Sequence, residues 1–209
     1  MSHFSDRTFS LAAVVVALLM FVMAGVVGGP DYGSDVAAIH SLAVERSTHA
    51  GLTGRAIFIT HFGGAEEMVT ILLIALALLV ILKRWRSALV LAGIVLGGRM
   101  TVELLKLLID RPRPSFTPYP VEIVSLSFPS GHSANSMITF LALALIVAPV
   151  KYRMAAVGAA ILASAAIGAT RPLLGVHWPS DVIGGWAFGI AWVVALVELS
   201  QGWRGAAKK

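Results

Sequence analysis

Six long apolar stretches alternate with short polar ones along this 209-residue chain. They cover residues 9–29, 64–82, 87–109, 132–150, 154–170 and 181–200. Each has about the length that a helix needs to cross the hydrocarbon core of a bilayer. Because hydrocarbon offers no partner for backbone polar groups, such stretches fold as helices. The pattern therefore predicts an all-α, polytopic membrane protein with six transmembrane helices.

The composition agrees with this prediction. Hydrophobic residues make up 57% of the chain and charged residues 13%, whereas a soluble domain carries about 25% charged residues. We expect a single integral-membrane domain over residues 1–209. The absence of cysteine excludes a disulfide or a thiolate site. The net charge of +5 comes from basic residues at the ends of apolar stretches, so we expect no nucleic-acid partner.

The first apolar stretch, residues 9–29, has two interpretations. It is free of charged residues and long enough to span a membrane. A secretory signal peptide is the alternative, but the stretch lacks a clear Ala-x-Ala site and its apolar run is too long. We expect a retained helix.

Basic residues predict the orientation of the six helices. One side of the membrane receives Arg7, Lys83, Arg84, Arg86, Lys151, Arg153, Arg204, Lys208 and Lys209. Cytoplasmic loops carry the excess of Lys and Arg. We therefore expect a protein of the cell (inner or plasma) membrane with both termini in the cytoplasm and with its polar motifs at the outer face.

Residues 30–63 form the longest stretch without a predicted crossing. Val36, Ile39 and Leu42 recur every three residues, with Asp35 among the polar positions between them. The spacing indicates a short amphipathic helix on the membrane surface. A surface loop with one or two helical turns explains it equally well.

The first polar motif follows the third apolar stretch. Lys106 precedes Arg113-Pro114 and lies on a stripe with Arg99, Glu103 and Asp110, at spacings of four, three and four. Charged residues at such depth are expected to face the bundle interior. The prolines favour an extended loop, from which Arg113 can bind a phosphate bidentately while Lys106 supplies a point charge. A loop with positive flanks, and a buried Arg99–Glu103 pair, are the plainer alternatives.

The second motif, Pro129-Ser130-Gly131-His132, stands directly before the fourth apolar stretch. Ser130 suits a helix N-cap, and Gly131 permits close backbone approach at a helix start that attracts anions. His132 would stand beside a bound phosphate and donate a proton to a leaving oxygen. An ordinary helix cap with an interfacial histidine is the alternative.

The third motif joins Thr170-Arg171 to His177 and to Asp181, which opens the sixth stretch. A carboxylate four residues after a histidine can fix its tautomer and stabilise its positive form. The second ring nitrogen of His177 is then a candidate nucleophile toward phosphorus. The alternative is a loop histidine, with Trp178 as an interfacial anchor and Asp181 as a helix cap.

Together the motifs supply three cations, a nucleophile, its orienting carboxylate and a separate proton donor on one predicted face. They require no metal, because Lys and Arg can neutralise the charge of a phosphoryl group. In order and spacing, Lys106-x6-Arg113-Pro114, Pro129-Ser130-Gly131-His132 and Arg171-x5-His177-x3-Asp181 resemble the three-part signature of the type 2 phosphatidic acid phosphatase superfamily. One departure is Thr170, where the family usually has serine. Vanadium-dependent haloperoxidases have a similar site but are larger, soluble proteins.

The resemblance implies a six-helix membrane lipid phosphatase with a phosphohistidine intermediate on His177, oriented by Asp181. It implies that His132 protonates the leaving group and that the phosphoryl group is bound by Lys106, Arg113, Ser130, Gly131 and Arg171. Its candidate substrates are undecaprenyl diphosphate, phosphatidylglycerol phosphate and phosphatidic acid, entering from the outer leaflet. A phosphotransferase with a lipid or sugar acceptor, and a non-catalytic lipid-binding or transport protein, are the alternatives. The oligomeric state is not predicted.

Overall fold

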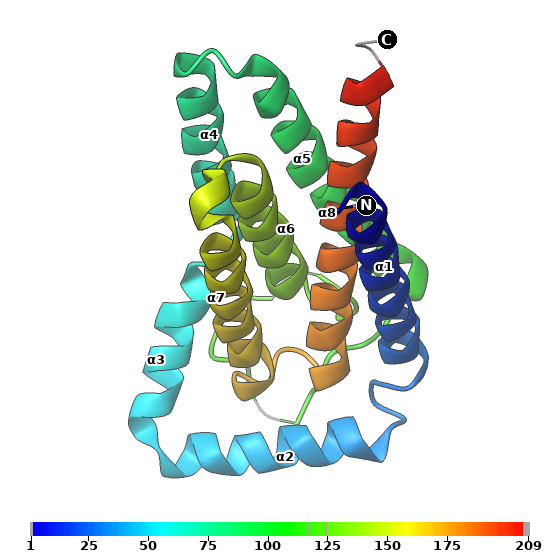
Figure 1. Ribbon diagram of the computed structural model, residues 1–209. Helices are drawn as coiled ribbons and strands as arrows, with labels where there is room; N and C mark the ends of the chain where they lie inside the picture. Colours follow the sequence, from blue (N-terminus) through cyan, green and yellow to red (C-terminus); the bar gives the residue numbers. More distant parts are fainter. Residues whose placement is uncertain (1, 117, 124, 207–209) are drawn as a thin grey trace.

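The computed structural model describes residues 2–116, 118–123 and 125–206, and this part of the chain is helical and free of strands (Figure 1). Its elements are α1 (Ser2–Val26), α2 (Gly33–Thr48), α3 (Ala50–His61), α4 (Ala65–Ile81), α5 (Trp85–Ile109), α6 (Gly131–Ile146), the short 3₁₀ helix η1 (Val150–Tyr152), α7 (Arg153–Leu173) and α8 (Pro179–Ala206).

Four helical stretches of the described chain are long and apolar enough to cross a membrane. They are Gly51–Ile81, Trp85–Ile109, Val150–Leu173 and Pro179–Ser200. Two shorter apolar helices, Ser10–Val26 and Gly131–Ile146, run among them. The chain is therefore a multi-pass, all-helical membrane protein, and the count of six crossings stays a prediction.

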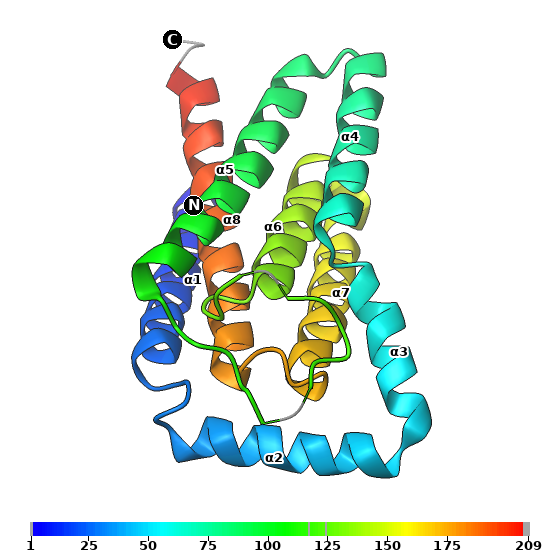
Figure 2. The same ribbon diagram turned by 180° about the vertical axis from the view of Figure 1, so that it is seen from behind.

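Helix α6 lies at the centre of the bundle and packs against α5, α7 and α8, while α1 lies along α8. Fully buried apolar side chains from four of the helices form the core, among them Leu79, Leu91, Val102, Ile138 and Val193. Helix α2 crosses one end of the bundle, and α3 returns from it toward α4 beside α7 (Figures 1 and 2). We call this end the site end, because the loops that carry the polar motifs gather there.

Close packing at Gly185 brings the start of α8 against the start of α6. A Cβ at this position would lie 2.8 Å from the backbone oxygen of Ser130 and 2.9 Å from Cβ of Ser133. Any larger residue would push the two helices apart. The glycine thus allows the second and third motifs to share one site.

The structure confirms one prediction for residues 30–63 and corrects another. The amphipathic segment is a helix, α2, with Ile39 buried on its inner side. The rest was left without a predicted helix, but it forms α3, whose helical stretch continues toward α4. Asp35 was placed among polar surface positions, yet it is 6% exposed because backbone and hydroxyl donors surround its carboxylate.

Part of the predicted charge asymmetry falls beyond what the structure describes. Lys208 and Lys209 lie outside the described residues, as do the side chains of Arg7 and Arg204. Arg84 lies at the end of the bundle opposite to the site end, where Nη2 donates to the backbone oxygen of Ile146 at 2.8 Å. The turn between α4 and α5 and the end of α6 therefore lie together there.

Candidate active site

All the predicted site residues lie at the site end of the bundle. Each is held by a helix terminus or by a loop that joins two helices: Lys106 in the last turn of α5, Arg113 in the α5–α6 loop, Ser130, Gly131 and His132 at the start of α6, Arg171 in the last turn of α7, His177 in the α7–α8 loop, and Asp181 in the first turn of α8. Helix termini converge here because consecutive helices run in opposite directions. The residues of the three motifs, which the sequence predicted on one face, therefore lie at the same end of the bundle.

The amine of Lys106 lies between the α5–α6 loop and the start of α6. Its Nζ donates to Oγ of Ser125 at 3.0 Å and pairs with Oε1 of Glu103 at 3.3 Å. A Cβ at Gly131 would lie only 3.2 Å from Nζ. The missing side chain at Gly131 therefore leaves room for this amine beside the first amides of α6.

The charged stripe on α5 faces the interior at one position only. Lys106 is 5% exposed, whereas Glu103 and Asp110 are exposed and Arg99 is intermediate. Within the described residues, Arg99 and Glu103 form no ion pair. The expectation that the whole stripe faces inward was wrong, because only the last turn of α5 is covered by the loop that carries Ser125.

Arg113 is fixed by carbonyl oxygens of two loops and points at His177. Its Nη1 donates to the oxygen of Val176 at 2.6 Å, and Nε donates to the oxygen of Ser125 at 2.6 Å. Nη1 also lies 3.0 Å from Nε2 of His177. A guanidinium has only donors, so Nε2 of His177 must be the acceptor and must carry a lone pair.

The other ring nitrogen of His177 faces a carboxylate. Nδ1 lies 3.3 Å from Oδ2 of Asp181 and 3.4 Å from Oγ of Ser127. Oδ2 of Asp181 also accepts from the backbone amide of Trp178 at 2.9 Å and from the hydroxyl of Ser127. His177 and Asp181 are 1% and 0% exposed. With the donor Arg113 at Nε2 and the acceptor Asp181 at Nδ1, the proton of the imidazole is assigned to Nδ1.

Burial and the nearby positive charges favour a neutral imidazole at His177. Burial lowers the pKa of His177 well below its ordinary value of 6.5, and the charges of Arg113, Arg171 and Lys106 lower it further. Burial also lowers the pKa of Arg113, against the opposing charge of Asp181. The pKa of Arg113 starts so high that it stays a cation at neutral pH.

Arg111 is a site residue that the sequence analysis missed. It stands two residues before Arg113, and it is 6% exposed. Its Nη1 donates to Oδ1 of Asp181 at 2.9 Å, and Nη2 donates to the oxygens of Ala24 and Gly25 at 3.1 and 2.7 Å. The guanidinium also lies over the ring of Phe128, 4.4 Å from its centroid. Arg111 therefore ties Asp181 to the end of α1.

A second carboxylate extends this buried network to α2. Nη1 of Arg111 donates to Oγ of Ser180 at 3.0 Å, and Ser180 in turn donates to Oδ2 of Asp35 at 2.5 Å. Oδ2 of Asp35 also accepts from the amide of Gly29 at 2.7 Å. One chain of hydrogen bonds thus connects the start of α2 with Asp181.

The second motif is held against the third by backbone contact. The amide of Ser130 donates to the backbone oxygen of Asp181 at 3.0 Å, and Ser130 is the N-cap residue of α6. Its side chain makes no capping bond; instead, Oγ accepts from the hydroxyl of Ser133 at 3.1 Å. Ser130 Oγ and the first amides of α6 therefore lie beside Lys106.

His132 and Arg171 line a pocket of about 340 Å³ that opens beside α3. Nη1 of Arg171 donates to Oγ1 of Thr60 at 2.7 Å, but its buried Nε has no partner among the described residues. Thr60 was missed by the sequence analysis. Glu122 and His61 lie at the same opening. The guanidinium of Arg171 thus brings a positive charge to the wall of this pocket, where an anionic ligand would be stabilised.

Comparison with known proteins matches residues 87–204 to the PAP2 superfamily. The chain is 40% identical over 114 residues to the lipid A 1-phosphatase of Rhizobium etli, a match that covers 50% of this chain and 46% of that protein. It therefore spans about half the length of this relative.

Two further relatives match over more of their length. Phosphatidylglycerophosphatase B of Bacillus subtilis is 32% identical over 176 residues, or 74% of this chain and 83% of that protein. Decaprenylphosphoryl-5-phosphoribose phosphatase of Mycobacterium tuberculosis is 32% identical over 176 residues. That match covers 82% of this chain and 92% of that protein.

The fold is also similar to a solved structure. The crystal structure of a transmembrane PAP2 type phosphatidylglycerolphosphate phosphatase from Bacillus subtilis superposes with a TM-score of 0.80 at 24% identity, over 90% of this chain and 96% of that one. The helical arrangement is thus shared.

Proposed function

The chain belongs to the PAP2 superfamily, and from this premise we propose that it is a membrane lipid phosphate phosphatase that hydrolyses a terminal phosphoryl group through a phosphohistidine on His177. One observation carries the proposal: Nε2 of His177 accepts a hydrogen bond from Arg113 at 3.0 Å while Nδ1 faces Asp181 at 3.3 Å. This is the protonation that a nucleophilic imidazole needs.

The phosphoryl group would lie among the cations and the start of α6. Arg113 and Arg171 would bind its oxygens with their forks, Lys106 would add a point charge, and Ser130 and Gly131 would donate from the hydroxyl and the backbone. Arg171 lines the pocket at His132, so its guanidinium would meet a phosphate oxygen there. These charges stabilise the transition state without a metal ion.

In the first step, the lone pair on Nε2 of His177 forms a bond to phosphorus. The bond from phosphorus to the leaving oxygen breaks, and its electron pair stays on that oxygen. Protonated His132 donates a proton to that oxygen, which leaves as an alcohol or, where the substrate is a diphosphate, as a lipid monophosphate. Asp181 stabilises the positive imidazole that results.

In the second step, water attacks phosphorus and gives a proton to the now neutral His132. The P–N bond breaks, its electron pair returns to Nε2 of His177, and inorganic phosphate leaves. His132 is again protonated, so the cycle is balanced by one water consumed for each phosphate released.

The substrate would be an amphiphile with its phosphate in the site and its chain in the bilayer. The pocket at His132 and Arg171 is also lined by Ile57 and Phe58, apolar residues of α3 exposed toward the surroundings. The names of the relatives point to a phosphate on lipid A, on phosphatidylglycerol or on a polyprenyl-linked sugar. Undecaprenyl diphosphate and phosphatidic acid complete the candidate set.

We also place the site end at the outer face, with six crossings and both termini inside. Since the chain has no cysteine, a single introduced cysteine supplies the one thiol that a maleimide can modify. In intact cells a membrane-impermeant maleimide should modify Ser34→Cys, at the start of α2, and should spare Lys83→Cys, in the α4–α5 turn. The reverse pattern would overturn this orientation.

The function is tested by phosphate release from a panel of the candidate lipids. His177→Ala should lose release by several orders of magnitude, whereas His49→Ala, an exposed histidine on the loop between α2 and α3, should match the parent protein. EDTA should have no effect. Turnover by His177→Ala would refute the nucleophile, and lipid binding without turnover on every substrate would favour a non-catalytic protein.

The covalent step is tested separately with a ³²P-labelled substrate. Quenching in alkali preserves phosphohistidine, and peptide mapping should place the label on His177. Chasing the label distinguishes the two enzyme classes: appearance in inorganic phosphate supports a phosphatase, and appearance in an added lipid or sugar alcohol supports a phosphotransferase.

A further inference from the structure

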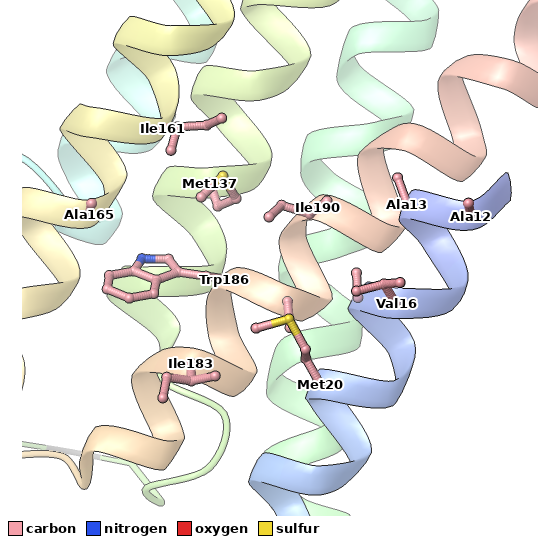
Figure 3. A pocket seen from close by; sticks show the side chains of 12 residues that line it. Ala12, Ala13, Val16, Met20, Met137, Ile161, Ala165, Ile183, Trp186 and Ile190 are labelled. Atoms are coloured by element: carbon pink, nitrogen blue, oxygen red, sulfur yellow. The ribbon is translucent and has the colours of Figure 1, made fainter. Parts of the chain in front are cut away.

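A second groove lies on the face of the bundle formed by α1 and α8, apart from the catalytic pocket (Figure 3). It has a volume of about 740 Å³, within the range of ligand sites. Residues of α1 lie on one side of it and Ile161 and Ala165 of α7 lie on the other, with Met137 of α6 and Trp186 of α8 between them (Figure 3). Its lining is apolar throughout, and it shares no residue with the pocket at His132.

The groove continues into a second pocket at the site end, where three polar side chains join an otherwise apolar lining. Met20 and Ile183 line both cavities, and the second one, of about 330 Å³, ends at Ser34, Asp35 and Ser180. From Ser180 to Ile190 the lining covers ten residues of α8, or about 15 Å at 1.5 Å per residue. That is half of a hydrocarbon core of about 30 Å. The combined cavity therefore has the length of one leaflet, with its polar end at the membrane surface.

The charge at the polar end selects the head group. Beneath the pocket, the guanidinium of Arg111 pairs with Asp181 and is linked to Asp35 only through the hydroxyl of Ser180. Two carboxylates and one cation leave a net negative charge there. The exposed hydroxyl of Ser34 and the carboxylate of Asp35 can accept hydrogen bonds, but a phosphate or carboxylate would be repelled.

We propose that this cavity binds a membrane lipid of the site-side leaflet, with one hydrocarbon chain along α1 and α8 and a head group that donates hydrogen bonds and carries no net negative charge. The site is separate from the phosphoryl site and does not depend on the proposed function. A lipid phosphate in the groove would not reach His177, because that histidine is closed off behind Asp181 and Ser180.

The test uses two photocrosslinking lipids with the same diazirine-bearing acyl chain. One is a monoacylglycerol, with two hydroxyls; the other ends in a sulfonate. Both are added to the full-length protein in nanodiscs, and crosslinked peptides are mapped by mass spectrometry. We expect the monoacylglycerol to label α1 and α8 around Met20 and Ile183 several-fold more than the sulfonate does. Equal labelling by both probes would overturn the head-group assignment.

Three variants test the apolar groove and its polar end separately. Ala165→Phe fills the groove and should reduce labelling several-fold, whereas Ala163→Phe, on the exposed side of the same helix, should not. Ser34→Lys should reverse the preference toward the sulfonate. Retained phosphate release by Ala165→Phe would show that the variant is folded. If Ala165→Phe instead changes the oligomeric state and leaves lipid labelling intact, the groove is an interface between copies and the proposal fails.

Discussion

Nη1 of Arg113 donates to Nε2 of His177 across 3.0 Å, so a guanidinium covers the nitrogen that would attack phosphorus. The same Arg113 is held by the carbonyl oxygens of Ser125, Leu126 and Val176. A bound phosphate would accept the hydrogen bond that Nη1 of Arg113 now donates to Nε2 of His177. Substrate binding and exposure of the nucleophile are thus linked through one side chain.

This contact leads to a prediction about pH. The pKa of His177 is lowered by burial and then by the charge of Arg113, so the neutral imidazole persists below pH 6.5 and protonates only in more acidic solution. Arg113→Gln removes that charge, which raises the pKa of His177 and moves the acid limb of kcat/KM to higher pH. Comparing both proteins on one substrate cancels the titration of the substrate phosphate. Arg55→Gln, an exposed change on α3, should leave the acid limb of kcat/KM in place. If the acid limb of Arg113→Gln also stays in place, Arg113 does not lower the pKa of His177.

Asp181 should be needed for turnover more than for binding. Asp181→Asn retains the shape of the side chain but loses the charge that stabilises the imidazolium of His177. By analogy with catalytic carboxylate–histidine pairs, kcat should fall on the order of 10³- to 10⁴-fold with little change in KM. Steady-state kinetics in detergent check this. A rise in KM alone would mean that Asp181 acts in substrate binding instead.

Most of the fold and the motif residues could be predicted from the sequence. Apolar length located α1 and α4 to α8, and the spacing within each motif placed cations, histidines and a carboxylate at or beside the ends of helices. Comparison confirms the family resemblance. These features are local, and local patterns are what hydropathy and spacing report.

The residues that support the site could not be predicted, because their partners are distant in the sequence. Arg111 meets Asp181 seventy residues later, and Thr60 meets Arg171 after 111 residues. No periodicity connects such pairs. One signal for Arg111 was present in the sequence, because Arg111, like Arg113, directly precedes a proline. Similarly, α3 was missed because its apolar run begins within a stretch of mixed polarity.

Thr60 should affect substrate affinity through Arg171. Thr60→Val removes the acceptor of Nη1 without changing the size of the side chain much, and leaves a buried guanidinium less well held. We expect KM to rise roughly three- to tenfold, less than the about 1.5–3 kcal/mol of a hydrogen bond to a charged group, because Thr60 acts on the substrate only through Arg171. Thr48→Val, at the exposed end of α2, is the matched control. An unchanged KM would show that Arg171 is held by its remaining surroundings.

Glu103 should have a small effect through Lys106. The pair is 3.3 Å apart, but the carboxylate side chain is half exposed, and solvent weakens such pairs to about 1 kcal/mol or less. Glu103→Gln should therefore reduce kcat/KM by no more than about fivefold and leave thermal stability unchanged. Glu66→Gln, an exposed change at the start of α4, should have no effect. A loss of orders of magnitude would place Glu103 in direct contact with substrate.

Arg111 should act as a positioning residue, because its guanidinium contacts Asp181 and lies away from the pocket at His132. Arg111→Lys keeps the charge but cannot reach Asp181, Ser180 and the α1 carbonyl oxygens together. We expect kcat to fall about 10- to 100-fold, since a hydrogen bond to a charged group contributes about 1.5–3 kcal/mol, and KM to change little.

Arg111→Gln sharpens this test. It leaves Asp181 without its cationic partner, so the protein should lose thermal stability as well as turnover. With less positive charge nearby, the imidazolium of His177 becomes easier to form, and the acid limb of kcat/KM should move to higher pH. A purely structural role would lower the melting temperature and leave that limb where it is. If KM rises and kcat is retained, Arg111 must instead reach the substrate, and the assignment of Arg113 and Arg171 as the two arginines that bind the phosphoryl group would have to be revised.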